Sequence, residues 1–440
     1  MKDSGIEWVG KIPNSWELRK TKYVADFNPK VTMAYDVNQP VGYVPMDAVK
    51  FGYMEPLEHE YNSLSTGLTQ FQEEDIVMAK VTPCFENGEI AIAKNLAQGV
   101  GLGSSELFVY RAKEIDQRYF FYYLQHRGFI DRAASTMTGV GGLKRVSSYF
   151  ANNAEVTFPC IEEQQSIADY LDDRCAKIDA IIAEAKASIE EYKDLKQAVI
   201  YEAVTKGLDK TVVMKDSGMP WIEDIPFNWK LVKITRILDK KHLYPIGDGD
   251  HGSIKTEQYR SDGIPFIRVQ NLGWGTELNL DNVVYISDED NEKIKNSTLK
   301  PNDILFAKTG ATIGKTGIMP INIPIANTTS HVGKITISEE HNSRYFFYVL
   351  SSQIGYRQFW DIALQKTTRP ELSIEETKSI KVVLPQSKKI EDEIVEYLDE
   401  KIPAFDQLLS EKQSLIDDLE AYKKSLIYEV VTGKRKVVAG

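Results

Sequence analysis

The sequence predicts an α/β (mixed α+β) fold in which two globular domains follow one another in tandem and are joined by two long helices that pair as a coiled coil. Residues 162–206 contain no proline or glycine, and their apolar side chains recur at the i, i+3, i+4, i+7 spacing of one helix face. Tyr170–Asp172 returns as Tyr397–Asp399, and Tyr201–Thr205 returns, with one change, as residues 428–432. Both matches have the same separation, so no residue is gained or lost between them.

The matched apolar stripes predict that the two long helices pack on each other, because a helix of this length cannot hide its stripe on a small domain. The residues expected to pair the helices are Ile178, Ile182, Ile189, Tyr192, Phe405, Leu409, Ile416 and Leu419. The same stripe includes Ile181, Leu195, Leu408 and Tyr422. Two unrelated surface helices on separate domains are the alternative.

The N-terminal sequence is also repeated. Residues 1–18 and 214–231 share Met-Lys-Asp-Ser-Gly, a tryptophan, Ile-Pro, a second tryptophan and a leucine at matching positions. The chain is therefore a tandem repeat with a pseudo-two-fold axis expected between its helices. The predicted division is residues 1–158 for the first domain, 159–212 for long helix 1, 213–385 for the second domain and 386–440 for long helix 2.

Within each domain, strand-like runs precede an aromatic helix. Asp75–Lys80 and Asp303–Lys308 correspond to each other and read as buried strands. Arg118–Leu124 and Arg344–Leu350 correspond as helices rich in tyrosine and phenylalanine. The sequences between these landmarks differ, as expected for two versions of one module with different surfaces, or for neutral drift.

Composition limits the class of protein. The 440 residues include no apolar run long enough for a membrane span, and the three cysteines are too dispersed for a zinc or disulfide framework. We expect a cytoplasmic protein. The net charge of −11 argues against nucleic acid at first sight. However, residues 161–206 hold 11 acidic against 6 basic side chains and residues 387–440 hold 12 against 9, so most of the excess lies on the helices.

No catalytic constellation is found. Residues 310–316 resemble a phosphate-binding P-loop but have three residues between the glycines where four are needed, so we interpret them as a turn. The Asp75 and Asp303 strands lack the second acidic residue of a metal-dependent nuclease. The six histidines form no metal-binding pattern, and the Asn-Pro-Pro-aromatic motif expected of an adenine methyltransferase is missing. We expect neither a catalytic residue nor a metal ligand in this chain.

Basic, polar loops are the candidate DNA-binding segments. Residues 138–148 and 365–373 occupy corresponding places after the aromatic helices, and residues 268–271 end a strand. Small residues allow close approach to phosphate, while Lys, Arg, Gln and Asn can contact phosphates or base edges. Ordinary solvated loops are the alternative. The candidate residues are Lys80, Lys144, Arg145, Ser147, Arg268, Gln270, Asn271, Lys308, Lys366, Thr368 and Arg369.

The whole pattern resembles the specificity (S) subunit of type I restriction-modification enzymes. The resemblance rests on the paired MKDSGxxWxxxIPxxW segments, on Pro159 followed by Glu163-Gln164 and Tyr170–Asp172, on residues 201–209, and on residues 247–252 with 263–270. It covers essentially the full chain. The second copy departs from it at Ser387–Ile390, where the Glu-Gln pair is missing.

The resemblance implies two target recognition domains, each reading one half of a split, asymmetric site in double-stranded DNA. It implies that the long helices pair antiparallel, set the spacing and dock two methyltransferase (M) subunits, with restriction/translocase (R) subunits joining that core. S-adenosylmethionine, ATP and magnesium would then belong to the partners, and this chain alone would not be an enzyme. The alternatives are a stand-alone DNA-modifying enzyme and a coiled-coil scaffold with no role on DNA.

Overall fold

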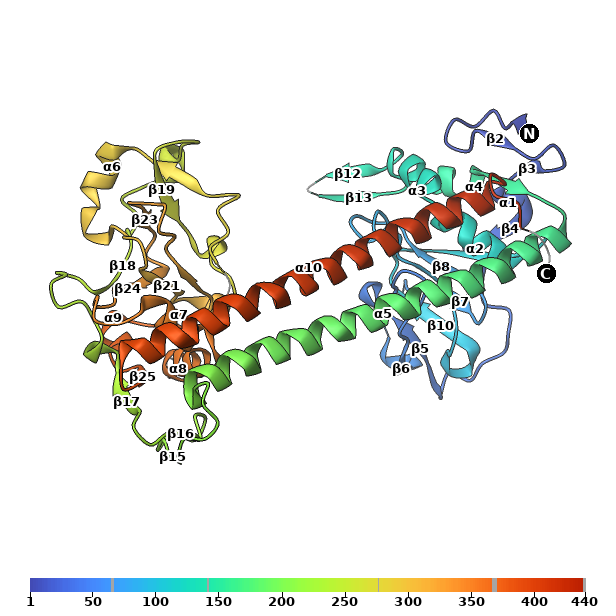
Figure 1. Ribbon diagram of the computed structural model, residues 1–440. Helices are drawn as coiled ribbons and strands as arrows, with labels where there is room; N and C mark the ends of the chain where they lie inside the picture. Colours follow the sequence, from blue (N-terminus) through green and yellow to red (C-terminus); the bar gives the residue numbers. More distant parts are fainter. Residues whose placement is uncertain (65–66, 141, 276, 366–369, 438–440) are drawn as a thin grey trace. The chain divides into compact units, whose positions relative to one another are not determined.

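The computed structural model describes residues 1–440 except 65–66, 141, 276, 366–369 and 438–440 (Figure 1). The chain forms two compact units: unit 1 comprises residues 1–186 and 413–440, and unit 2 comprises residues 187–412. Each unit therefore contains part of both long helices. Among the described residues, no helix is long and apolar enough to cross a membrane.

The two long helices are α5, Ile161–Lys206, and α10, Lys388–Val431. Each ends shortly before a glycine with a left-handed backbone, Gly207 (φ 73°) and Gly433 (φ 69°). A residue with a Cβ atom adopts this conformation only at a cost, so glycine is favoured as the helix stop. In the repeat, Gly433 aligns with Lys206, so α10 ends slightly earlier than α5 does.

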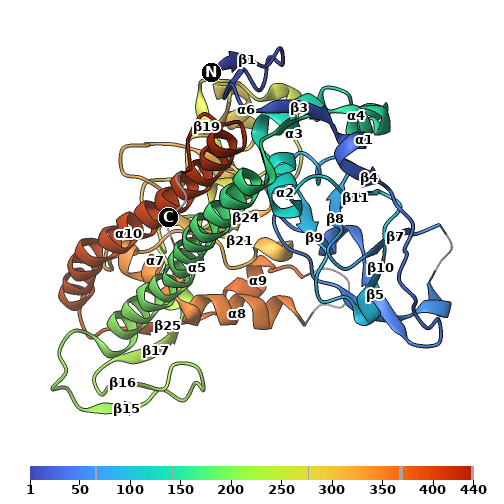
Figure 2. The ribbon, with the colours of Figure 1, turned by 90° about the vertical axis from the view of Figure 1, so that its right-hand side faces the viewer.

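The helices pair antiparallel within each unit. In unit 1, Lys423 Nζ lies 2.7 Å from Asp179 Oδ2, and Lys186 Nζ lies 4.0 Å from Glu420 Oε1. In unit 2, Lys196 Nζ lies 2.6 Å from Asp406 Oδ1. As the residue number of the α5 partner increases in these pairs, the residue number of the α10 partner decreases, as expected for antiparallel helices. Figure 2 shows the two helices side by side in this arrangement.

The buried side of each helix follows a heptad pattern. Ile178, Ile182, Ile189 and Ile416 are buried, and Tyr192, Phe405, Leu409 and Leu419 are half-buried. The stripe is narrower than the sequence predicted, because Ile181, Leu195, Leu408 and Tyr422 are 39–50% exposed. Each of these four lies one position before a residue of the seam, so it flanks the contact and remains in water.

Segment 1, residues 1–158, contains two four-stranded sheets. The first has the order β6 (Leu57–Glu60), β5 (Pro40–Val44), β10 (Val100–Gly103), β7 (Thr69–Gln72). The second has the order β4 (Ala25–Phe27), β11 (Leu107–Ala112), β8 (Ile76–Ala79), β9 (Ile90–Ile92). Two-stranded ribbons pair β1 (Lys2–Asp3) with β2 (Lys11–Ile12), and β3 (Glu17–Lys20) with β14 (Glu155–Phe158). The helices are α1 (Thr21–Val24), α2 (Gln117–Gln125), α3 (Arg127–Ala134) and α4 (Ser148–Asn153).

Segment 2, residues 213–385, repeats this plan with one four-stranded and one three-stranded sheet. The main sheet has the order β18 (Ile246–Asp248), β24 (Val332–Ile335), β21 (Ile304–Ala307), β22 (Thr316–Ile318). A three-stranded sheet has the order β20 (Val284–Ile286), β19 (Ile264–Ile267), β23 (Asn327–Thr328). The ribbons are β15 (Met214–Asp216) with β16 (Asp224–Pro226), and β17 (Lys230–Lys233) with β25 (Lys381–Leu384). The helices are α6 (Asp288–Lys293), α7 (Ser343–Ser351), α8 (Gln353–Ala363) and α9 (Ile374–Thr377). The predicted tandem α/β repeat is confirmed.

The aromatic helix α2 packs between the second sheet of segment 1 and α5 (Figure 2). The Arg118 guanidinium donates to Asp172 of α5 at 2.6 Å, and the Tyr122 hydroxyl donates to the other oxygen of that carboxylate at 2.7 Å. Unit 2 repeats the cluster, because Arg344 and Tyr348 of α7 both donate to Asp399 of α10. In both units this Arg-Tyr-Asp cluster joins the globular segment to the long helix that follows it.

The same aromatic helix also contacts the end of the other long helix. The Tyr119 hydroxyl donates to the Val431 carbonyl at 3.2 Å, and the Thr157 hydroxyl donates to that carbonyl at 2.7 Å. In unit 2, the Tyr345 hydroxyl donates to the Val204 carbonyl at 3.1 Å. Val204 and Val431 are equivalent in the repeat. Each unit therefore combines the beginning of one long helix with the end of the other.

The two junctions differ at one buried position. Gln164 and its equivalent Glu391 both accept the backbone N–H of the residue that caps the aromatic helix, Asp116 or Asn342. Glu391 additionally contacts His341 Nδ1 at 3.0 Å. Burial raises the pKa of Glu391 above its ordinary value. The departure from the Glu-Gln pattern therefore places an ionisable group where the first copy has a neutral amide.

We expect Glu391→Gln to raise the free energy of unfolding at pH 8 by on the order of 1 kcal/mol, because the glutamine can accept the same backbone N–H without burying a charge. A raised pKa in the folded state means that the ionised form is disfavoured, so stability is lost as pH rises through that pKa. The advantage of the variant should therefore shrink as pH falls toward 4.5. Denaturant unfolding at several pH values measures this.

Gln164→Glu is the matched control, because Ile115 stands where segment 2 has His341. This substitution should lower the free energy of unfolding at pH 8, and the difference from wild type should shrink as the pH falls. Equal unfolding free energies for wild type and Glu391→Gln at every pH would contradict the assignment of a destabilising buried carboxylate.

Candidate nucleic-acid interface

A short β-hairpin forms the most exposed basic loop of segment 1. It consists of β12, Thr138–Val140, and β13, Leu143–Arg145, and all six residues are exposed. We call it the hairpin arm; Figure 1 shows its two strands beside α3. Thr82, just beyond β8, fixes its position by accepting the Lys144 N–H at 3.0 Å and donating its hydroxyl to the Gly142 carbonyl at 2.6 Å.

Two of the predicted cations at this site already have polar partners within the chain. Arg145 donates Nε and Nη2 to the two carboxylate oxygens of Glu106, each at 2.8 Å. This hydrogen bonding lowers the pKa of Glu106 below its ordinary value. Lys80 Nζ donates to the Ser105 carbonyl at 2.6 Å and lies 5.5 Å from the centre of the Phe108 ring. The Arg145–Glu106 pair therefore holds the base of the arm, and the Lys80 side chain is held against Ser105 and Phe108.

The structure places Lys144 and Ser147 in different roles. Lys144 is exposed, and its ammonium group has no ion-pair partner among the residues that the structure describes. Ser147 caps α4 by accepting the Phe150 N–H at 3.4 Å. Of the four candidates in segment 1, Lys144 is the one whose side chain remains available to a ligand.

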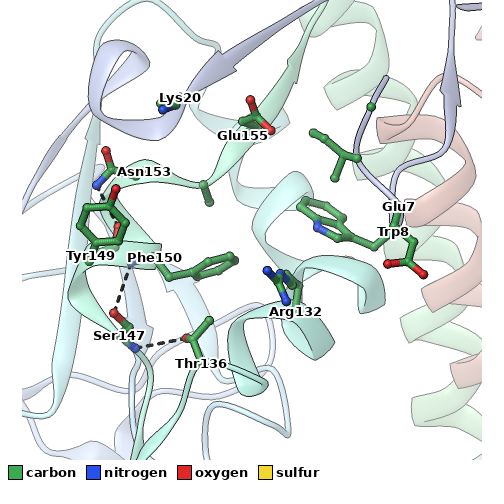
Figure 3. A pocket seen from close by; sticks show the side chains of 13 residues that line it. Glu7, Trp8, Lys20, Arg132, Thr136, Ser147, Tyr149, Phe150, Asn153 and Glu155 are labelled. Carbon is green, nitrogen blue, oxygen red and sulfur yellow. Dashed lines mark hydrogen bonds between the residues drawn. The ribbon is translucent and has the colours of Figure 1, made fainter. Parts of the chain in front are cut away.

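An open cavity of about 630 Å³ lies between α3, α4 and the N-terminal turn (Figure 3). Trp8 and Phe150 line it, and the exposed Arg132 reaches it from α3. Tyr149, at its rim, is 78% exposed. Arg132 and Tyr149 were not predicted from the sequence, because a single Arg and a single Tyr in short helices carry no recognisable pattern.

In segment 2, the strand-tip candidates separate by burial. Asn271 is 1% exposed, and its side chain accepts the Arg268 N–H and donates to the Asn279 carbonyl, each at 2.9 Å. The Asn271 side chain closes a backbone turn and does not face solvent, which disagrees with the prediction that it contacts DNA. Arg268 is half-buried, donates to the Asn282 carbonyl at 3.1 Å and lies 5.5 Å from the Tyr259 ring. Gln270 is exposed.

Lys308 is not a free cation either. It is 4% exposed, with its ammonium 2.5 Å from Asp248 and 3.9 Å from Glu371. A buried lysine requires such partners, so its role is to close the end of the sheet. The remaining candidates, Lys366, Thr368 and Arg369, lie outside the described residues. A further cation was missed: Lys315 lies 5.9 Å from the ring of Trp274, which is 50% exposed.

The acidic strand residues have structural partners. Both carboxylate oxygens of Asp75 accept from Arg111 at 2.7 Å, and Asp303 accepts the Thr336 hydroxyl at 2.6 Å. Residues 310–312 form a 3₁₀ turn that leads into β22. A P-loop would open a helix, so the interpretation of this motif as a turn is confirmed. Within the described ranges, no group of His, Cys, Asp or Glu side chains is arranged to hold a metal ion.

The family of the chain follows from comparison with known proteins. The family model described as "Type I restriction modification DNA specificity domain" matches residues 13–191 and again residues 228–416. The two matches cover most of the chain, one for each copy of the repeat. The chain belongs to this family of type I restriction-modification DNA specificity proteins.

Two curated relatives illustrate the similarity. The chain is 27% identical over 369 residues to the type I restriction enzyme EcoAI specificity subunit of Escherichia coli, with 68% of this chain and 62% of that subunit covered. It is 23% identical over 435 residues to the MjaVIII specificity subunit of Methanocaldococcus jannaschii, covering 97% of this chain and 94% of that subunit. The match thus spans less than two thirds of the EcoAI subunit.

A solved structure supports the fold. The chain resembles a subunit in a structure described as showing complex assembly and conformational transition of the type I R-M system, with a TM-score of 0.70 and 15% identity. The similarity covers 97% of this chain and 100% of that one. At this identity the likeness concerns the fold.

We expect Lys144→Ala to weaken DNA binding about equally on every duplex and to reduce the salt dependence by roughly one phosphate contact. Arg145→Ala should act differently, because it exposes the Glu106 carboxylate beside the DNA. Lys94→Ala is a control: Ile92 pairs with Ile76, so Lys94 lies at the opposite end of the sheet from the arm. Affinity measured at several salt concentrations gives the comparison. If Lys144→Ala bound every duplex with wild-type affinity, the arm would be better interpreted as an ordinary solvated loop.

Proposed function

We propose that this chain is the DNA-recognition subunit of a type I restriction-modification complex, with segments 1 and 2 each reading one half of a bipartite, asymmetric site. The observation that carries the proposal is the double match to the DNA specificity family, one match in each structural repeat. The two segments share their strand order around the Asp75 and Asp303 strands but differ in their loops. Two segments that share a strand order but differ in their loops are suited to binding two different half-sites.

We further propose that the paired helices dock two M subunits and set the spacing between half-sites. Within unit 1, Ile181, Leu415 and Tyr422 are 44–49% exposed on the helices. Within unit 2, Leu195 and Leu408 are 50% and 39% exposed. In an antiparallel pair such flanking positions of both helices lie on the same side of the seam. Large apolar side chains grouped on a helical surface support docking of an apolar protein face.

The chemistry then belongs to the partner subunits. S-adenosylmethionine would bind to the M subunits, and ATP and magnesium to R subunits that join the same core. This chain would supply recognition, with no catalytic residue of its own, and would work in the cytoplasm. Partner subunits would also supply part of the phosphate contact, which reconciles DNA binding with the net charge of −11.

We expect co-expression with the M subunit to produce one methylated sequence with two defined parts separated by a fixed unspecified spacer, detected by methylome sequencing. The chain purified alone should transfer no methyl group, cut no DNA and hydrolyse no ATP. Methyl transfer by a preparation free of M subunit would identify a stand-alone enzyme. A complex that binds all duplexes equally, or none, would favour the coiled-coil scaffold.

A further inference from the structure

The tip of the hairpin arm carries two apolar side chains in water. Val140 is 89% exposed and Leu143 is 57% exposed. The two residues are direct cross-strand partners, so their side chains lie on the same face of the ribbon. A ligand that covered this valine and leucine would provide the stabilisation that their exposure forgoes.

The opposite face of the arm has a different character. Lys144 pairs with Gly139, one register step from the apolar pair, and therefore points to the other side. A Cβ atom on Gly139 would lie 2.2 Å from the Leu143 carbonyl oxygen, so only glycine fits there. The face of the apolar pair continues toward the base of the arm with Thr138 and with Arg145, which is paired with Glu106. The other face has a single cation, Lys144, beside bare backbone.

We propose that the hairpin arm enters the major groove of DNA and that Val140 and Leu143 contact the C5 methyl groups of thymine, with Lys144 directed to a phosphate. This inference rests on the proposed function and specifies how segment 1 reads its half-site. The major groove admits a two-stranded β-ribbon, and thymine is the base that presents an apolar group there. The positively charged second face matches the phosphate wall.

A protein partner fits the arm less well. Two side chains at the end of a narrow ribbon form a far smaller surface than the roughly 800 Å² per partner of a specific protein interface. The residues next to the apolar pair are glycine, threonine, lysine and arginine, which suit a polyanion. The arm is also held at its base by Thr82 and by the Arg145–Glu106 pair, so its tip is presented in a defined position.

The test uses the complex of the full chain with its M subunit and the site found by methylome sequencing. In duplexes carrying that site, each thymine of the half-site read by segment 1 is replaced in turn by deoxyuridine, which keeps the base pair and removes the methyl group. We expect at least one replacement to weaken wild-type binding about fourfold, the value of one buried methyl group. The same replacement should have no effect on the double variant Val140→Ser, Leu143→Ser.

Leu57→Ser is the matched control, because Leu57 is 54% exposed on β6 of the same segment. It should retain wild-type binding and the wild-type response to deoxyuridine. A wild-type complex that binds its site but is indifferent to every deoxyuridine overturns the thymine contact and leaves the proposed function intact. A double variant that no longer retains the M subunit also overturns it, in favour of a protein-docking tip. A wild-type complex without sequence preference overturns both.

Discussion

The hydrogen bonds from Tyr119 and Tyr345 to the end of the opposite long helix determine how the rest of the chain is organised. Each tyrosine lies in an aromatic helix whose arginine and second tyrosine bind an aspartate near the start of the following long helix. A globular segment is therefore complete only with the start of one helix and the end of the other. This requirement makes the helices antiparallel and explains why each compact unit draws on residues distant in sequence.

The repeat also explains the distribution of charge. The seam between the helices is apolar, but ion pairs such as Asp179–Lys423 and Lys196–Asp406 lie along it and have opposite polarity in the two units. Because Lys196 and Lys423 are largely buried at seam positions, their aspartate partners offset the cost of removing an ammonium group from water. Acidic residues concentrated on the helices leave the arm and loops of the globular segments comparatively basic.

Much of the fold was predictable from the sequence because it depends on periodicity and repetition. The 3.6-residue stripe, the recurrence of Tyr170–Asp172 and the matched strands at Asp75 and Asp303 each correspond to a structural element. The site was less predictable. Whether Arg145 and Lys308 are free depends on Glu106 and Asp248, which tertiary folding brings close from distant positions. Asn271 is held by a local turn that closes on Asn279, and its sequence does not reveal that turn. The apolar stripe was predicted to be wider than it is, because spacing alone does not distinguish residues in the helix–helix contact from the exposed residues beside it.

If each segment needs the start of one long helix and the end of another, residues 1–210 alone should find the missing helix end in a second copy. This fragment has segment 1 and α5 but lacks Val431; Val204 of a second copy stands in the equivalent position to accept from Tyr119. Burying the exposed stripe favours the same outcome, since each large apolar side chain left wet forgoes roughly 1.5–3 kcal/mol. The measurement is its molar mass by light scattering at tens of micromolar. We expect a folded antiparallel homodimer; a folded monomer would show that a segment does not need the end of a second helix.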